Sequence, residues 1–354
     1  MADNDFLKAS KGLSHDRIPI WIMRQAGRYL PEYQEIREKA SFMDICRTPS
    51  LMAEVTRQPV DIFGFDAAIM FSDILLPLEP LGVSVDFQKG GPVLSPPVRQ
   101  PEDVERLSSF DPEAELGFVL DGIRNIKNVL NSDTPLIGFC GAPFTMAYYA
   151  IEGGGSKGGS EIKRFIYQHP RAAHKLLGMI AELVGEYLVT QISAGVDAVK
   201  LFDSRAGILS THDYRKFALP YVKRVFEICG QKGVPRLLFM ENCRPFLKHL
   251  SEVECEVVSI DWRTEIPDAM RVLDGKTVQG NLDPHVLLAA PDVLREETLR
   301  VLDSVENHDR YIFNLGHGIL PQVPVGNVHL LVDTVHSYRC GSTKDDKSRI
   351  TSKI

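Results

Sequence analysis

Short apolar runs recur along the chain, and longer segments with helical periodicity separate them. Such a run, bounded by small or polar residues, predicts a strand that is buried on both faces. The segments between the runs, such as 31–40, 115–130, 172–195 and 291–305, have the spacing of amphipathic helices. Eight runs can be identified, and they end near Gln25, Asp73, Gly141, Ser204, Asn242, Asp261, Asn281 and His317.

Alternating strands and helices predict parallel strand pairing with crossover helices. Eight such units in 354 residues match an α/β fold of the (β/α)8 TIM-barrel type better than an open doubly wound sheet, which remains the alternative. We expect a single barrel domain over residues 1–340 and a polar, disordered tail over residues 341–354. In a barrel the active-site cleft lies at the C-terminal ends of the strands, so the polar residues that end the runs would meet at one mouth.

The composition narrows the class of protein. The formal charge of −7 argues against a nucleic-acid binder, because phosphate affinity comes largely from clustered Lys and Arg. Six cysteines occur without a CxxC spacing, so neither disulfides nor a zinc ribbon are expected. The amino terminus has no apolar signal region, and no run approaches ~18 apolar residues, so we expect a cytoplasmic protein without a membrane span.

One charged motif stands out, "MRQAGRYLPEYQEIR" at residues 23–37, which contains Arg24, Arg28 and Arg37. Pro31 suits the first turn of a helix, and the helical neighbours of Arg37 include no acidic partner. Solvated surface charge is the simple explanation for one arginine. Three arginines at the exit of the first strand favour a site for a polyanionic ligand, held by paired hydrogen bonds to carboxylate or phosphate.

Two further residues are candidates for the same mouth. Asp73 lies in an apolar run, where a carboxylate must be paired, hydrogen-bonded or protonated; the alternative is a structural acid. His317 lies between two glycines, where the backbone can approach a ligand closely; the alternative is a hydrogen-bonded loop residue. Glu241 and Cys243 resemble metal ligands only weakly, because Cys243 has no companion cysteine, and we expect no metal. "GGGSKGG" lacks the GxxxxGK[ST] pattern and does not indicate nucleotide binding.

The motifs "MRQAGRYLPEY", "FSDIL", "GAPFT", "IEGGGS", "FDSRAG", "QGNLDP" and "NLGHGI" occur in this order. Over roughly residues 5–338 the chain resembles the uroporphyrinogen decarboxylase family. The resemblance implies a cofactor-free, homodimeric barrel enzyme of porphyrin and haem biosynthesis, which removes carbon dioxide from the four acetate groups of uroporphyrinogen III to give coproporphyrinogen III. By motif position it assigns catalysis to Asp73 and Arg37, and substrate binding to Arg24, Arg28, Asp73, Tyr149, Ser204 and His317.

One residue departs from the family pattern: Arg205 follows the serine of "FDSRAG", where some relatives have histidine or tryptophan.

Two alternative functions stay open. A zinc-dependent methyltransferase of the same barrel superfamily would act on corrinoid or thiol substrates, and a noncatalytic tetrapyrrole-binding protein would bind without turnover.

Decarboxylation needs an electron sink for the carbanion, and without a cofactor the protonated pyrrole ring of the substrate must serve. Asp73 fits the carboxylate that would stabilise this cationic ring. The proton donor is open: Arg37 is a candidate by family analogy, although an arginine releases its proton reluctantly, and a substrate carboxyl or a relayed water is the alternative.

Overall fold

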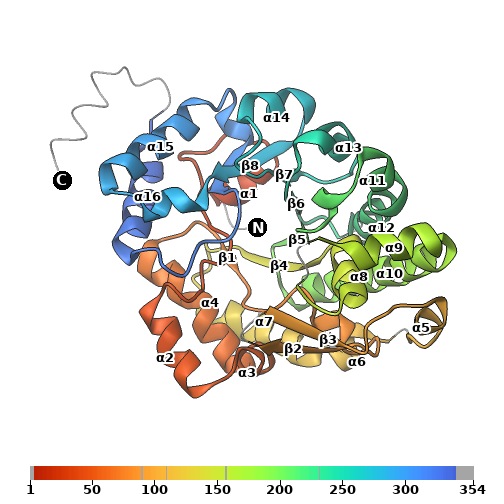
Figure 1. Cartoon of the computed structure of the whole chain (residues 1–354). Coiled ribbons are helices and arrows are strands. Elements are labelled where there is room, and N and C mark those ends of the chain that lie inside the picture. The colour runs from red at the N-terminus through yellow and green to blue at the C-terminus, as the bar shows by residue number, and fades with distance from the viewer. Residues whose placement is uncertain (1–3, 89–90, 109, 156–157, 231, 340–354) are drawn as a thin grey trace.

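The computed structural model describes residues 4–88, 91–108, 110–155, 158–230 and 232–339, so the tail expected at 341–354 lies outside the described residues. Seven parallel strands form a curled sheet in the order β1-β4-β5-β6-β7-β8-β9, and helices surround it on the outside (Figure 1). The strands are β1 (Ala68–Ile69), β4 (Leu136–Gly141), β5 (Ala198–Asp203), β6 (Arg236–Met240), β7 (Val257–Ser259), β8 (Thr277–Leu282) and β9 (Tyr311–Leu315). The predicted barrel architecture is therefore confirmed.

Residues 19–23, in the run 19–25 that was predicted as the first strand, occupy the eighth position of the barrel without forming a regular ladder. Ile20 makes a single parallel bridge to Phe313 of β9, and the Asp66 amide donates to the Ile20 carbonyl (2.9 Å) just before β1. The amides of Ile20 and Met23 donate to the side chains of Asp66 and Asn314 (2.8 and 3.2 Å). Because side chains replace the strand carbonyls as acceptors, the expectation of a regular strand was wrong here, although the segment closes the barrel.

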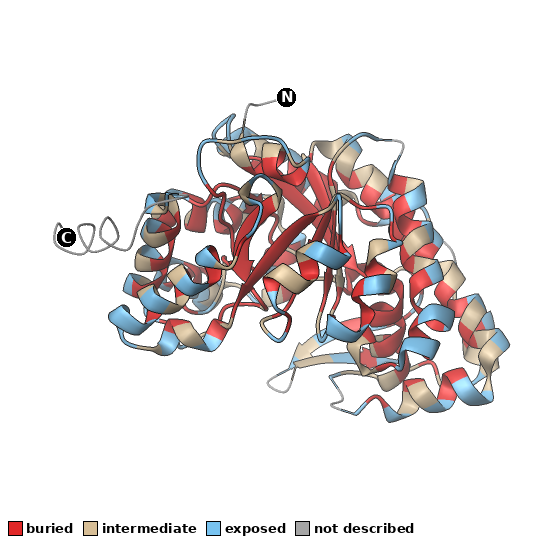
Figure 2. Ribbon diagram, turned by 90° about the horizontal axis from the view of Figure 1, so that it is seen from above, coloured by how far each residue is buried: buried red, intermediate tan, exposed pale blue. Residues whose placement is uncertain are grey.

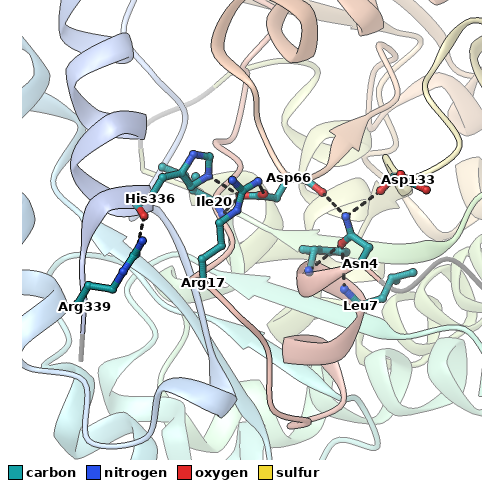
Figure 3. Close-up of polar contacts among 9 residues, drawn as sticks. Asn4, Leu7, Arg17, Ile20, Asp66, Asp133, His336 and Arg339 are labelled. Atoms are coloured by element: carbon teal, nitrogen blue, oxygen red, sulfur yellow. Dashed lines mark hydrogen bonds and ion pairs between the residues drawn. The ribbon is translucent and has the colours of Figure 1, made fainter. Parts of the chain in front are cut away.

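Asp66 joins three segments at the end of the barrel opposite the mouth (Figure 3). Besides the Ile20 amide, its buried carboxylate accepts from Arg17 Nη2 (2.5 Å) and from Nε2 of His336, near the carboxyl end of the chain (2.8 Å). The Asn4 amide donates to the carbonyls of Asp66 and Asp133 (3.4 and 2.8 Å). One carboxylate thus ties the amino-terminal segment, β1 and the last helix together.

The outer layer consists of helices whose inner faces are buried and whose outer faces are exposed (Figure 2). The helices are α1 (Asp5–Ser10), α2 (Pro31–Lys39), α3 (Phe42–Arg47), α4 (Pro49–Phe63), α5 (Pro101–Glu105), α6 (Pro112–Glu115), α7 (Gly117–Val129), α8 (Pro143–Glu152), α9 (Ser160–Gln168), α10 (Pro170–Ala194), α11 (Thr211–Phe217), α12 (Leu219–Gly230), α13 (Leu247–Ser251), α14 (Ile266–Val272), α15 (Pro291–Asp303) and α16 (Val325–Ser337). Short 3₁₀ turns add η1 (Leu76–Leu78), η2 (Ala206–Ile208), η3 (Arg244–Phe246), η4 (Pro284–Leu288) and η5 (His308–Arg310).

Among the described helices, α10 alone is long and apolar enough to cross a membrane by length and composition. Of its most apolar window, 56% is buried inside the protein, and the helix packs against α8 and α12. Its apolar character is accounted for by this position in the core.

Two segments differ from the sequence-based expectation. Residues 88–101 are rich in Gly and Pro, which predicts a loop, but they contain β3 (Gly91–Ser95), which pairs with β2 (Ser84–Gln88) in an antiparallel hairpin. Val93 of this hairpin bridges to Gly154. The helical periodicity of residues 211–230 predicts one helix, but the segment forms two, because the chain breaks at Ala218 (φ −126°) before Pro220 in the first turn of the next helix.

Candidate active site at the barrel mouth

Arg24 lies in a tight turn at the exit of the 19–23 segment. It has a positive φ of 65°, and with Asn242 (φ 56°) it is one of two non-glycine residues with positive φ in the described chain; both follow strand positions at the mouth. Such a backbone costs of order 1 kcal/mol and is concentrated at functional sites. A Cβ at Gly318 would lie 2.5 Å from Arg24 Cδ, so glycine at 318 makes room for the arginine.

Asp73 follows β1 and is half-buried. Its Oδ1 accepts from the Leu75 amide (2.8 Å), while Oδ2 has no hydrogen-bond partner among the described residues. Burial raises the pKa of this carboxyl to about 6, and the Leu75 amide and the Arg24 guanidinium offset part of that rise. Asp73 is therefore a carboxylate of unusually high basicity, ionised at neutral pH and with one oxygen free for a ligand.

Tyr149 on α8 and the turn after β5 form the opposite side of the site. Arg205 Nε and Nη2 donate to Tyr149 Oη (3.2 and 2.8 Å). The Arg205 amide donates to Thr145 Oγ1 (3.1 Å), which in turn donates to Asp203 (2.7 Å). The half-buried Ser204 hydroxyl makes no hydrogen bond to another described residue, so it is available to a ligand.

His317 follows β9 and packs edge-on against Phe239, with ring centroids 5.9 Å apart. Burial, together with the positive charges of Arg24, Arg205 and Arg263, lowers the pKa of His317 to about 4. The imidazole is thus neutral at pH 7. The glycine before it also has a packing role, since a Cβ at Gly316 would lie 2.5 Å from the Trp262 backbone nitrogen.

The three arginines whose positive charges lower the pKa of His317 also affect the pKa of Glu241. Burial raises the pKa of Glu241, and Arg205, Arg263 and Arg24 oppose that rise. The strand ends therefore bring Arg24, Arg205 and Arg263, which we call the arginine trio, around one half-buried carboxylate and one neutral imidazole. This concentration of positive charge suits an anionic ligand.

Arg28 and Arg37 lie on the α2 side of the mouth. Arg28 is exposed, and its positive charge helps to lower the pKa of Arg24. The charges of Arg28 and Arg37 oppose the rise that burial causes in the pKa of the buried Tyr33. Arg37 donates to the Ala40 carbonyl (2.7 Å) at the end of its own helix. Within the described ranges none of Arg24, Arg28 and Arg37 has a carboxylate partner within ion-pairing distance, as the sequence predicted for Arg37.

Sequence reasoning missed Arg263, whose place directly after the end of the 257–262 run was the available signal. Its Nη1 donates to buried Asp261 (2.7 Å), and its guanidinium stacks 4.0 Å from the Trp262 ring centroid. Lys200 was also missed: in the barrel interior its Nζ donates to Ser259 and Gln279 (both 2.6 Å), and burial lowers its pKa far below the ordinary value. No sequence signal distinguishes such a buried lysine from an exposed one.

The residues considered for zinc do not form a metal site. Cys243 is buried, its Sγ lies 3.6 Å from Asp261 Oδ1 and 3.3 Å from Thr264 Oγ1, and burial raises the pKa of its thiol to about 12. No group of three or more His, Cys, Asp or Glu side chains in the described part of the chain has a metal-binding arrangement, and the zinc-dependent methyltransferase alternative is not favoured.

A separate cavity of about 270 Å³ lies outside β8, between α14 and α15. Its walls include Trp262, Asn281 and Arg300. None of the residues expected to bind substrate lines it, so we assign no part of the site to this space.

A TIM barrel that gathers a basic carboxylate and several arginines at the C-terminal ends of its strands has the layout of the barrel enzymes, whose active sites lie at that end. Residues 1–338 match the family Uroporphyrinogen decarboxylase (URO-D), and the chain belongs to this family. It is 47% identical over 335 residues to uroporphyrinogen decarboxylase of Syntrophotalea carbinolica (94% of this chain, 97% of the relative). It is 46% identical to that of Geobacter metallireducens (94% and 98%).

A methyltransferase from Methanosarcina mazei has a similar structure, with a TM-score of 0.79 over 93% of this chain and 96% of that one. Its sequence is only 18% identical, so the likeness concerns the fold. A B12-independent methionine synthase from Shewanella is more distant, with a TM-score of 0.56 and 12% identity. The barrel is thus shared by enzymes with different chemistry, and the function of this chain has to be argued from its site and its family.

Proposed function

We propose that this protein is a carboxy-lyase of porphyrin and haem biosynthesis. It converts uroporphyrinogen III to coproporphyrinogen III by removing carbon dioxide, in steps, from the four acetate side chains. Its membership of the uroporphyrinogen decarboxylase family supports this activity. The structural observation that carries the proposal is Asp73, a half-buried carboxyl whose pKa is raised to about 6 and whose Oδ2 accepts no hydrogen bond from another described residue.

The charges at the mouth fit the substrate, which carries eight carboxylates. Arg24, Arg28 and Arg37 have no acidic partner in the described chain, so their guanidinium groups are available for paired, charge-assisted hydrogen bonds. Ser204 and His317 add neutral groups. Because the His317 pKa is about 4, the imidazole binds as a neutral partner and is not the acid that protonates the substrate at pH 7.

Asp73 would accept hydrogen bonds from the pyrrole N–H groups of the bound substrate. When a ring is protonated next to the acetate that will be lost, it becomes cationic and takes up the electron pair of the breaking C–CO2 bond. After carbon dioxide has left, the methylene carbon takes up one proton to become the methyl group, and the ring returns the proton that it received. The attraction between the ring and Asp73 then grows toward the transition state, and only interactions that grow in this way accelerate the reaction. Half-burial of Asp73 strengthens the effect, because fewer water molecules screen it.

The source of the ring proton is the second element of the proposal. We retain Arg37 as a candidate by family analogy. Arg37 donates to the Ala40 carbonyl (2.7 Å), and an arginine releases its proton reluctantly. A substrate carboxyl or a relayed water is therefore the alternative donor.

We further propose a homodimer in the cytoplasm, with a tetrapyrrole as the only ligand and with one catalytic domain over residues 1–340. Family membership supports the tetrapyrrole. Sedimentation at micromolar concentration tests the dimer, and a monomer alone would contradict it.

The experiment that tests the activity is direct. Purified protein is mixed under anaerobic, reducing conditions with uroporphyrinogen III, and the remaining carboxylates are counted by chromatography after oxidation of the products. We expect stepwise formation of products with seven, six, five and four carboxylates. Tight binding without any loss of carboxylate would show a tetrapyrrole-binding protein instead, and would refute the enzymatic proposal.

A further inference from the structure

The contact between Arg205 and Tyr149 joins a residue outside the family pattern to a proposed substrate-binding residue. The guanidinium lies 5.2 and 5.1 Å from the ring centroids of Tyr148 and Tyr149, and two of its nitrogens donate to the Tyr149 hydroxyl (3.2 and 2.8 Å). Arg205 is half-buried, so water competes only weakly for these bonds.

The backbone beneath the guanidinium is fixed as well. The Arg205 amide donates to Thr145 Oγ1 (3.1 Å), and Thr145 donates to the fully buried Asp203 (2.7 Å). The side chain therefore leaves a rigid turn, and the two-pronged contact with Tyr149 is made by a pre-positioned group.

A phenol has one proton to donate and two lone pairs with which to accept. In Tyr149 both acceptor positions are taken by Arg205, so the hydroxyl proton has to point away from the guanidinium. A hydrogen bond that a cation donates to an oxygen also polarises it and strengthens the bond that the oxygen donates onward. Tyr149 is thereby fixed as a hydrogen-bond donor.

A second cation lies near the donor. Tyr149 and Arg24, the residue at the exit of the 19–23 segment, interact electrostatically at the mouth. An anion between Tyr149 and Arg24 would receive an O–H bond from one side and guanidinium N–H bonds from the other. Without Arg205, Tyr149 could equally turn its proton toward another acceptor and present a lone pair, which repels a carboxylate.

We propose that Arg205 is a positioning residue that acts through Tyr149: it holds the hydroxyl as a donor to one substrate carboxylate, which lies between Tyr149 and Arg24. This inference rests on the proposed function, because the carboxylate belongs to the proposed substrate. It adds a role for a side chain to which the family pattern gives none.

The test compares Arg205→Ala, Arg205→Lys, Tyr149→Phe and the double variant Arg205→Ala/Tyr149→Phe in the decarboxylation assay, with kcat and KM measured separately. We expect Arg205→Ala to raise KM about tenfold, the value of one charge-assisted hydrogen bond, with kcat within about threefold of the parent. Because both residues act on the same carboxylate, the double variant should have a KM within about twofold of the weaker single variant.

Arg205→Lys keeps a positive charge near the Tyr148 and Tyr149 rings but loses the planar, two-pronged guanidinium, so its KM should lie between those of the parent and Arg205→Ala. The control is Arg300→Ala, which removes an exposed arginine that pairs with Glu297 on α15 (2.8 Å) and should leave KM unchanged. Thermal midpoints of all variants establish that they are folded.

Three results would overturn the inference: a KM of Arg205→Ala within twofold of the parent, a KM of Arg205→Lys no better than that of Arg205→Ala, or a double variant whose KM rises by the product of the two single effects. A parent protein without turnover would refute the proposed function instead, so the two failures are distinguishable.

Discussion

Replacing Asp73 by Asn removes one negative charge from the mouth and keeps an oxygen that can accept the Leu75 amide, now 2.8 Å from Oδ1. The substitution separates two roles, because a catalytic carboxylate and a structural carboxylate predict opposite effects on stability. Replacing a structural acid would lower the stability of the folded state. An acid that is held half-buried for catalysis makes the folded state less stable, so replacing it should raise the stability.

The size of the stability effect follows from the pKa. Burial raises the Asp73 pKa from the ordinary 3.8 to about 6. A carboxyl whose pKa rises on folding has no effect on stability below its unfolded pKa. Between the unfolded and the folded pKa it increasingly destabilises the folded state, and above the folded pKa the full cost is reached, roughly 1.4 kcal/mol for each tenfold change in proton affinity. The full effect is roughly 3 kcal/mol at pH 8, and solvent screening at a half-buried site reduces it. We therefore expect Asp73→Asn to be about 1 to 3 kcal/mol more stable at pH 8, with no gain near pH 4.

Turnover should change in the other direction. The attraction between Asp73 and the cationic ring is lost, and preorganised interactions of this kind are worth roughly 100- to 1000-fold in rate. Asp73→Glu keeps the charge in a displaced position and should fall between Asn and the parent. Urea unfolding at pH 8 and near pH 4, together with the decarboxylation assay, measures both effects.

The matched control is Asp203→Asn. Burial also raises the pKa of Asp203, to about 7, but its Oδ1 is bonded to Thr145 (2.7 Å) and the residue supports the turn rather than the substrate. It should lose at most about tenfold in turnover, the value of one hydrogen bond, so that a loss of roughly 100-fold or more is specific to Asp73. If folded Asp73→Asn turned over within threefold of the parent, or were less stable at pH 8, Asp73 would be a structural acid.

Four further outcomes are expected. As the pH is lowered, kcat/KM should fall with an apparent pKa near 6, because Asp73 must be ionised. If Asp203→Asn, rather than Asp73→Glu, shifted this apparent pKa, the assignment to Asp73 would be contradicted. His317→Gln should keep turnover within about tenfold, since the imidazole is already neutral at pH 7 with a pKa of about 4; complete loss of activity would show an acid–base role. Arg28→Lys should raise KM with little change in kcat, because the ammonium keeps the charge and loses the fork, and steady-state kinetics with an unchanged KM would argue against carboxylate binding. Asp66→Ala should lower the free energy of unfolding by roughly 3 kcal/mol, since it leaves the Ile20 amide without its acceptor, while kcat per folded molecule stays constant; a matching loss of kcat would show that this face is coupled to the mouth.

Much of the fold could be read from local patterns. Apolar runs predicted β4, β5, β6, β7, β8 and β9, because a strand that is buried on both faces has to be apolar throughout. The helices α2, α7, α10 and α15 followed from periodicity in the same way. Asp73 and His317 were identified as mouth residues because, in a barrel, the residue that ends each strand has a known position in space.

The first strand could not be read in this way. Its sequence is as apolar as the others, but whether it forms a ladder depends on which groups accept its amide protons, and these are side chains distant in sequence, Asp66 and Asn314. The hairpin formed by β2 and β3 was likewise hidden in a Gly- and Pro-rich stretch that is typical of loops.

The electrostatics of the site depend on tertiary structure alone. The sequence determined that arginines, an aspartate and a histidine would stand at strand ends, since their order along the chain and the barrel topology suffice for that. It did not determine that Arg205 contacts Tyr149 across 56 positions, nor that the pKa of Asp73 rises and that of His317 falls. Burial and neighbouring charge set these values, and both come from segments that meet only when the barrel closes.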